Sequence, residues 1–224
     1  MANLQFYFHP SPNPMKVALL LEELGLTYDV VPVDTFKGAQ HEAAFKTVNP
    51  NAKVPAIVDG VATVFDSNAI LLHLADKHGK FMPTGDGRAE ALSWLFFVAT
   101  GLSPFSGQAV HFLKMCPEDL PYAKNRYLKE VIRHYNVLEE RLQTSTFLGG
   151  DSYSIVDMAA WGWMSYAGYI FDDGLAQFPR VKALFDLISA RPAAERANAL
   201  KARDFSLKQA FDVETQKALF PQNF

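Results

Sequence analysis

The sequence predicts an α/β plus all-α fold, in which an α/β half precedes a helical bundle. Short runs of β-branched and aromatic residues, bounded by glycine and proline, end at Phe65. Beyond a stretch rich in glycine and proline at 81–88, helical periodicity replaces the strand pattern. We therefore expect an α/β domain at 1–80, a linker at 81–88, an all-helical domain at 89–203 and a tail of no clear structure at 204–224.

Composition and charge narrow the class of protein. Of the 224 residues, 49% are hydrophobic, which is ample for a packed core. The formal charge of -3 comes from mixed acidic and basic residues, and this argues against an electrostatic surface for nucleic acid. No signal sequence and no apolar run of about 18 residues is evident. We expect a soluble, cytoplasmic protein whose partners are small molecules or proteins, with neither nucleic acid nor membrane.

The single cysteine, Cys116, limits the sulfur and metal chemistry that the chain itself can carry. It excludes an intrachain disulfide, a Cys-x-x-Cys redox motif and a thiolate metal site. After His41-Glu42, the second histidine of a zinc-protease helix is missing. We expect no metal, and we interpret Cys116 as a bystander, so any sulfur chemistry has to come with a ligand.

The first strand ends in a proline-rich turn, and a helix begins there. Prolines at positions 10, 12 and 14 stiffen the turn, and Ser11 and Asn13 offer its short polar side chains. Asn13 before Pro14 is a helix start signal, with Asn13 as N-cap. Apolar residues at helical spacing continue to Leu24, and Gly25 ends the helix. Taken alone, this pattern fits either a plain cap or an anion site at the positive end of the helix dipole.

A second strand and a short helix follow. Tyr28 to Val33 reads as a strand, and its internal proline suits an edge strand or a bulge. A polar stretch then leads to a short helix around Glu42 to Thr47, which the run Val48 to Asn51 stops.

Two β-branched runs, Val54 to Val58 and Val61 to Phe65, form a predicted antiparallel hairpin. The dipeptide Asp59-Gly60 between them is typical of a type I′ turn. Pro55 near the start of the first run cannot donate to a strand ladder and needs an explanation. A cis Val54-Pro55 peptide would present the Val54 backbone to an extended peptide ligand. The alternative is an ordinary trans proline on an edge strand.

Helices account for the rest of the chain. Asp66-Ser67-Asn68 caps a helix that ends at Gly79, which completes the order β-α-β-α-β-β-α. Ser154 and Asp157 form a capping box at a later helix start. Aromatic residues at 161, 163, 166 and 169 on that helix are interpreted as core or dimer packing. Helices are expected at 89–116 with an interruption near 101–104, and at 122–142, 155–171 and 179–190.

These motifs resemble those of the cytosolic glutathione transferases. The shared features are Val-Pro before the third strand, an acidic-Ser pair before the third helix and Ser-x-x-Asp in the helical half. The resemblance extends to about Pro192, and segments 7–13, 53–59 and 121–127 are most similar to the bacterial nu class, the disulfide-bond oxidoreductase type, and to the related domain of a yeast prion regulator. It implies a thioredoxin-like first domain, a homodimer, and glutathione as cosubstrate.

The resemblance also implies a catalytic pair. Ser11 and Asn13 would face the glutathione sulfur, with Ser11 where nu-class proteins usually have threonine. Tyr7 is a rival, because some transferase classes use a tyrosine at the end of this strand, although its apolar surroundings favour a core role. Pro14 could sharpen or disturb the aim of Asn13. The thiol of free glutathione has a pKa near 8.5, and lowering it by about 2 units takes roughly 2.7 kcal/mol, which a helix N-terminus and hydrogen bonds can supply.

Binding roles follow from the same resemblance. Asp66, in place of a more frequent glutamate, and Ser67 would hold the γ-glutamyl group. The backbone of Val54, beside Pro55, would pair with the cysteinyl unit. Other implied contacts are Lys53 and Gln40 with the glycyl carboxylate, and Arg126 with a second glutathione or the far half of glutathione disulfide.

The predicted activity is reduction of a disulfide or peroxide by bound glutathione, or conjugation of glutathione to an electrophile. A pocket between the domains, lined by Phe105, Gln108 and Phe112, would take a small hydrophobic, disulfide or peroxide substrate. The alternative is a non-enzymatic glutathione-binding or regulatory module on the same fold.

Overall fold

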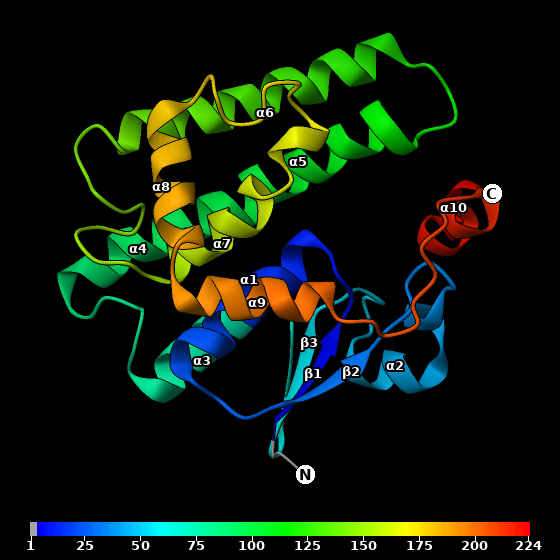
Figure 1. Cartoon of the computed structure of the whole chain (residues 1–224), viewed down its shortest axis with the longest axis horizontal. Helices are drawn as coiled ribbons and strands as arrows, with labels where there is room; N and C mark the ends of the chain where they lie inside the picture. The colour runs from blue at the N-terminus through cyan, green and yellow to red at the C-terminus, as the bar shows by residue number, and fades with distance from the viewer. Residues whose placement is uncertain (1–3) are drawn as a thin grey trace.

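The computed structural model describes residues 4–224. The first half of the chain folds around a mixed four-stranded sheet (Figure 1). Its strands lie in the order β2-β1-β3-β4, with β1 parallel to β2 and antiparallel to β3. The predicted element order is confirmed, and β2 is an edge strand as its proline indicated. The bounds are β1 (Leu4–Phe8), α1 (Pro12–Leu24), β2 (Asp29–Pro32), η1 (Ala39–His41), α2 (Ala43–Val48), β3 (Ala56–Asp59), β4 (Ala62–Phe65) and α3 (Ser67–His78).

Helix α1 begins earlier than the sequence predicted. Its N-cap is Ser11, in an extended conformation with φ -149° and ψ 165°, so the assignment of Asn13 as N-cap was wrong. Pro12 has the fixed φ that suits a first helical position, so the helix begins at Pro12, one residue before Asn13. Gly25 ends the helix at φ 65°, as predicted. Asn13 therefore lies inside the first turn.

The hairpin turn also differs from its prediction by one residue. Asp59 pairs with Ala62, so the turn residues are Gly60 and Val61. A type I′ turn needs positive φ at both central positions, and a β-branched residue such as Val61 disfavours positive φ. Gly60 has φ 63°, but Val61 is not among the residues with positive φ, so the turn is not type I′. The peptide between Val54 and Pro55 is cis, which decides between the two alternatives left by the sequence.

The helical half contains all four predicted helical segments, with changed ends. Helix α4 begins at Asp86, inside the predicted linker, and α7 ends at Met164, well before Phe171. The expected interruption near 101–104 is a π-helical turn in a continuous helical stretch. The bounds are α4 (Asp86–Phe97), η2 (Val98–Leu102), α5 (Ser103–Val110), η3 (His111–Met115), α6 (Pro121–Arg141), α7 (Ile155–Met164), η4 (Ala167–Tyr169), α8 (Pro179–Ser189) and α9 (Pro192–Ala202). The sequence signals did not predict α9.

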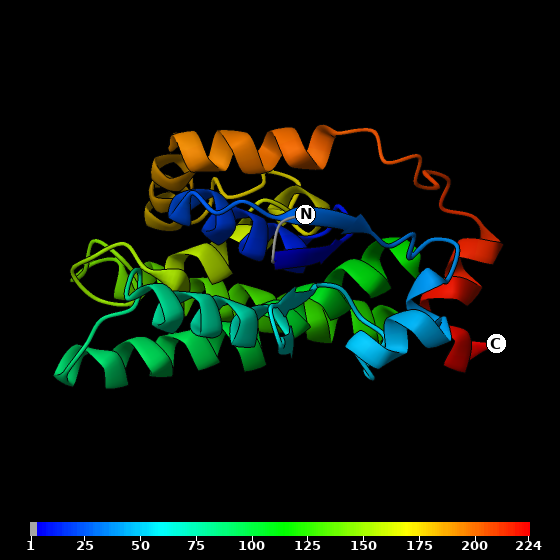
Figure 2. The ribbon, with the colours of Figure 1, turned by 90° about the horizontal axis from the view of Figure 1, so that it is seen from below.

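The C-terminal segment has structure that the sequence did not indicate. It contains α10 (Val213–Leu219) and η5 (Pro221–Asn223). Figure 2 shows this segment leaving α9 and running back to the α/β half. The amide of Lys208 donates to the Asp34 carboxylate at 3.0 Å, and the Phe36 and Phe211 rings meet edge to face. The segment therefore packs against the loop after β2.

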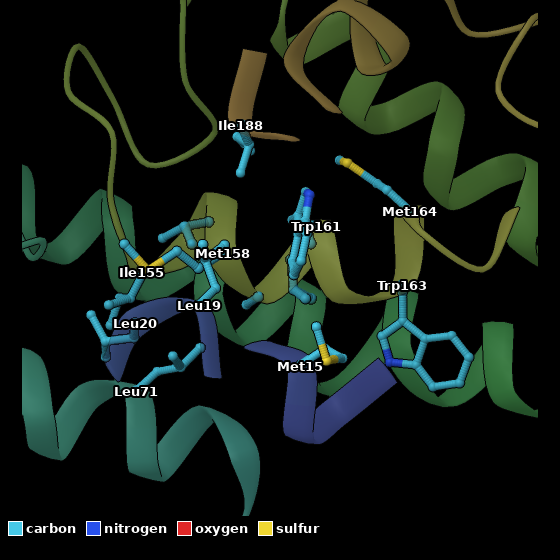
Figure 3. Packing of buried hydrophobic residues seen from close by; sticks show 14 of the residues in the cluster. Met15, Leu19, Leu20, Leu71, Ile155, Met158, Trp161, Trp163, Met164 and Ile188 are labelled. Carbon is cyan, nitrogen blue, oxygen red and sulfur yellow. The ribbon is translucent and has the colours of Figure 1, made fainter. Parts of the chain in front are cut away.

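Helix α1 joins the two halves through one hydrophobic core. It contacts α3 of the first half and α7 and α9 of the second. Figure 3 shows Met15, Leu19 and Leu20 of α1 against α7 residues that include Met158 and Trp161. These side chains are fully or almost fully buried. Trp161 is thus a core residue, as predicted. In the part of the chain that the structure describes, no helix has the length and apolarity needed to cross a membrane.

The predicted capping box at the start of α7 is present. Ser154 accepts a hydrogen bond from the Val156 amide, and the Asp157 carboxylate accepts one from the Ser154 amide at 2.9 Å. The other oxygen of Asp157 accepts from the Leu148 amide at 2.8 Å, which fixes the preceding loop. Burial raises the pKa of Asp157 to about 6, against the opposing effect of these hydrogen bonds. One carboxylate therefore anchors both the loop and the helix.

Replacing this carboxylate tests its structural role. We expect Asp157→Ala to lower the free energy of unfolding by about 2–4 kcal/mol, because two buried amide groups lose their acceptor. The control is Asp151→Ala in the same loop, where the side chain is exposed and the change should stay within about 0.5 kcal/mol. Urea unfolding measures both. Equal stabilities for the two variants would contradict the anchoring role.

Candidate functional site

A cavity of about 140 Å³ opens where the N-terminal ends of α1, β3 and α3 meet. Five of the predicted binding residues and the predicted catalytic residue Asn13 line it, and two further asparagines complete the wall. The lining residues are Asn13, Asn49, Asn51, Lys53, Val54, Pro55, Asp66 and Ser67. Residues from three segments of the chain, at 13, 49–55 and 66–67, thus line one polar cavity.

Asp66 fixes the α3 end of the cavity. Its oxygen Oδ1 accepts hydrogen bonds from the amides of Asn68 at 2.8 Å and Ala69 at 3.2 Å, which caps α3. Both bonds use Oδ1, so Oδ2 lies outside the cap. The backbone of Asp66 has φ 71° and ψ 126°, a conformation that costs an L-residue on the order of 1–3 kcal/mol. Such strain is typical of binding sites. A carboxylate oxygen and a helix N-terminus therefore lie side by side.

The loop before β3 is shaped by Asn49, a residue that the sequence reasoning used only as part of a helix stop. The buried Asn49 side chain donates to the Lys53 carbonyl at 2.6 Å and accepts from the Asn51 amide at 2.9 Å. Asparagines flanking a proline often make such side-chain turns, and this signal could have predicted the loop. The turn holds Lys53 and Val54 at the cavity wall, where neither belongs to a strand ladder.

Two aromatic residues, 150 and 156 positions later in the chain than their partners, hold the start of α1 and the turn before it. The indole of Trp163 donates to Asn13 Oδ1 at 3.1 Å, and the Tyr166 hydroxyl donates to the Pro10 carbonyl at 3.3 Å. Figure 3 shows Trp163 beside the start of α1. Because Oδ1 of Asn13 is occupied as an acceptor, its amide nitrogen remains as the donor. These two aromatic residues, predicted to be packing residues, also orient the candidate catalytic turn.

Ser11 lies at the same turn but not on the cavity wall. Its hydroxyl donates to the His9 carbonyl over 3.4 Å, a long and weak contact. The hydroxyl can therefore rotate toward a ligand at small cost. Tyr7, the rival residue, packs its ring against Phe45 with centroids 5.7 Å apart, and it does not line the cavity either.

Lys16, in the second turn of α1, is a buried lysine that the sequence analysis did not identify as a site residue. Lys16 has no exposed surface, and its ammonium donates to the Ser103 hydroxyl at 3.0 Å. Burial lowers the pKa of Lys16 to about 7, partly offset by the negative charge of Asp66. Gly162 makes room for its stem, because a Cβ there would lie 2.6 Å from Lys16 Cγ and 2.5 Å from the Pro12 carbonyl oxygen.

Gln40 does not line the cavity. Its side chain is 2% exposed and donates to the Ala218 carbonyl at 3.0 Å, and His41 contacts the same carbonyl at 2.9 Å. The C-terminal segment, for which no structure was predicted, therefore covers the position from which Gln40 was expected to reach a ligand.

The residues predicted for a second substrate also lie away from the cavity wall. Arg126 is exposed and paired with Glu130, one turn along α6, at 2.9 Å. The rings of Phe105 and Phe112 pack against an α6 tyrosine, with centroids 6.3 and 5.2 Å from it, and Gln108 is exposed. The structure does not gather these four residues into one pocket with the six at the cavity wall.

The fold and the cavity together define a two-domain protein with a polar site for a small ligand. A thioredoxin-like sheet with three helices precedes an all-helical half, and the cavity presents polar groups suited to an extended ionic peptide. Among residues 4–224, no group of three or more histidine, cysteine, aspartate or glutamate side chains is placed to hold a metal ion.

The chain belongs to the glutathione S-transferase family. Residues 10–77 match the model of the glutathione S-transferase N-terminal domain, and residues 102–192 match that of the C-terminal domain. The fold class and the family expected from the sequence are confirmed.

One curated relative and two solved structures are similar to this chain over most of its length. The chain is 42% identical over 203 residues to the disulfide-bond oxidoreductase YfcG of Escherichia coli, covering 87% of this chain and 94% of that one. A Burkholderia graminis glutathione transferase, solved with two glutathione molecules per subunit, superposes with a TM-score of 0.82 at 36% identity over 87% of this chain and 86% of that one. The URE2P6 transferase of Phanerochaete chrysosporium, solved with oxidized glutathione, gives 0.85 at 32% identity over 90% and 97%.

The close approach of α7 to α1 can be tested with a single methyl group. We expect Gly162→Ala to lower the free energy of unfolding by about 1–3 kcal/mol and to weaken glutathione binding, because the first turn of α1 must shift. Gly168→Ala is the matched control, since a Cβ there meets nothing within 4 Å. Thermal unfolding and calorimetric titration with glutathione measure the two effects. Unchanged binding in Gly162→Ala would show that this contact does not set the site.

Proposed function

We propose that this protein is a glutathione-dependent oxidoreductase that binds glutathione in the cavity and uses its thiolate to reduce disulfides. The observation that carries the proposal is the arrangement of Asn13, Lys53, Val54 and Asp66 around one cavity of about 140 Å³. The names of the relatives support it, because one is a disulfide-bond oxidoreductase and two were solved with glutathione or its oxidized form.

The cavity matches the charges of glutathione from end to end. Asp66 Oδ2 would accept from the γ-glutamyl ammonium, and the amide and hydroxyl of Ser67 at the start of α3 would bind the neighbouring carboxylate. The Val54 backbone would pair with the cysteinyl unit in the manner of an added strand. Lys53 would meet the glycyl carboxylate. Gln40 would join it only after release from Ala218.

The sulfur would lie against the first turn of α1. The amide nitrogen of Asn13, oriented by Trp163, and the hydroxyl of Ser11 would donate hydrogen bonds to the thiolate. Each hydrogen bond to a charged group contributes roughly 1.5–3 kcal/mol, comparable with the roughly 2.7 kcal/mol needed to lower a thiol pKa by about 2 units. Asn13 and Ser11 are the proposed catalytic residues.

The proposed reaction exchanges one disulfide for another. The glutathione thiolate attacks one sulfur of the substrate disulfide, a new S–S bond forms, and the other sulfur leaves as a thiolate that takes a proton from water. A second glutathione then attacks the mixed disulfide and releases glutathione disulfide and the second product thiol. Two glutathione molecules supply the two electrons. Reduction of a peroxide or conjugation to an electrophile would use the same thiolate.

The location of the second substrate is part of the proposal. We place the second substrate between the two halves, near Phe105, Gln108 and Phe112. Arg126 would release Glu130 and then bind the far half of a disulfide substrate. Arg126 lies on the surface, so its i,i+4 ion pair is weak enough for an anionic ligand to displace. We also propose that the protein works in the cytoplasm, where glutathione keeps thiols reduced.

A homodimer is proposed from the family resemblance and from exposed apolar side chains. Phe65 on β4 and Phe96 on α4 are 42% and 59% exposed. Analytical ultracentrifugation is expected to give twice the chain mass of 25.0 kDa. We expect Phe65→Glu with Phe96→Glu to shift the protein toward monomer, because a charge in an apolar interface loses its hydration. A wild-type protein that sediments as a monomer at all concentrations would contradict the dimer.

The thiolate absorbance of bound glutathione, followed against pH, tests the function. We expect the wild-type protein to lower the thiol pKa by about 1–2 units, and Asn13→Ala or Ser11→Ala to reverse much of this shift. Tyr7→Phe is the matched comparison and should leave the shift in place.

Two outcomes would contradict this assignment. Binding of glutathione with an unshifted thiol would favour a non-enzymatic binding module, and a loss confined to Tyr7→Phe would make tyrosine the catalytic residue. Reduction of a small disulfide such as hydroxyethyl disulfide by glutathione, measured with the same variants, should follow the thiolate fraction.

A further inference from the structure

The start of α1 is a poor source of positive charge for a helix N-terminus. Such an end normally presents four free amide groups. At α1 these belong to Ser11, Pro12, Asn13 and Pro14, and the two prolines carry no N–H. The next amide, that of Met15, is already bonded to the Ser11 carbonyl at 3.2 Å. Half of the usual donors for an anion are therefore missing where the sulfur is proposed to bind.

Lys16 is placed to replace them. It lies three residues after Asn13, so the two side chains start on the same face of α1, with Cβ atoms about 5–6 Å apart. Long side chains on a helix point back toward its N-terminus, and the Lys16 stem lies with the Pro12 carbonyl oxygen around the position that a Cβ on Gly162 would occupy. Gly162 leaves space for the stem, and Ser103 accepts from the ammonium at 3.0 Å.

The surroundings of Lys16 do not explain a buried cation by themselves. The acceptor that it contacts is a neutral hydroxyl of α5, and the α7 residue against its stem is Gly162, which carries no charge. The charged group that acts on it is Asp66, at the cavity wall. A cation near a helix N-terminus also opposes the helix dipole. Burial lowers the pKa of Lys16 to about 7, so near neutral pH only part of the protein carries this charge, and an anion bound in the cavity would favour the charged form.

We propose that Lys16 is an electrostatic positioning residue for the glutathione thiolate, supplying the positive charge that the two prolines withhold from the start of α1. This rests on the proposed function. Lys16 does not touch the ligand, and it acts across the first turn, through a water-poor interior in which charges interact more strongly than in bulk water. The coupling is reciprocal, so a bound thiolate also favours the protonated form of Lys16.

The test compares Lys16→Met with Lys46→Met, a control that removes one exposed cation from α2. We expect Lys16→Met to raise the pKa of the bound glutathione thiol by about one unit, a tenfold loss of thiolate below both pKa values, while Lys46→Met leaves it unchanged. Binding of S-methylglutathione, which has no ionisable thiol, should change less than about twofold in both variants.

A purely structural role for Lys16 would give a different pattern. Equal weakening of glutathione and S-methylglutathione binding in Lys16→Met, or an unchanged thiol pKa, would overturn the proposal. Lys16→Met should melt at or above the wild-type temperature, because it removes a buried charge. If it fails to fold, Lys16→Gln, which keeps a donor for Ser103, is subject to the same criteria. A wild-type protein that binds glutathione without shifting its thiol would overturn the proposed function and this inference together.

Discussion

The contact between the first turn of α1 and the middle of α7 is the constraint on which the site depends. Gly162 allows the two backbones to approach, and Trp163 then reaches Asn13. The same helix α1 carries core residues such as Met15 and Leu19 that join the two halves. The proposed sulfur end of the site and the interface between the halves therefore share the first turn of α1, and a change in packing between the halves would change that turn.

Charge in the cavity is arranged in opposite ways at its two ends. At the start of α3, the Asp66 carboxylate and a proline-free helix N-terminus offer both signs to a zwitterionic group. At the start of α1, Pro12 and Pro14 remove amide donors, and Lys16 is buried behind them. A stiff turn with few donors binds an anion weakly without help from a nearby cation. In our proposal, the charge of the buried lysine compensates for the amide donors that the two prolines lack.

Features set by local signals could be predicted from the sequence, and features set by distant packing could not. The capping box at Ser154 and the helix stop at Gly25 needed a few neighbouring residues only. The pocket residues were named from the family resemblance, and the fold places six of them on one cavity. Trp163 contacts Asn13 across 150 residues, and nothing local marks it as part of the site. Gln40 was assigned by its place in the family pattern, but a C-terminal segment without sequence signals covers it.

A crystal structure of the protein with glutathione tests the central claim most directly, namely that the first turn of α1, held by α7, forms the sulfur site. The predicted result is a sulfur within hydrogen-bonding distance of both the Asn13 amide nitrogen and the Ser11 hydroxyl, with the bond from Trp163 to Asn13 retained and the γ-glutamyl ammonium on Asp66. A sulfur bound to the Tyr7 hydroxyl, or a glutathione molecule bound outside the cavity, would contradict it.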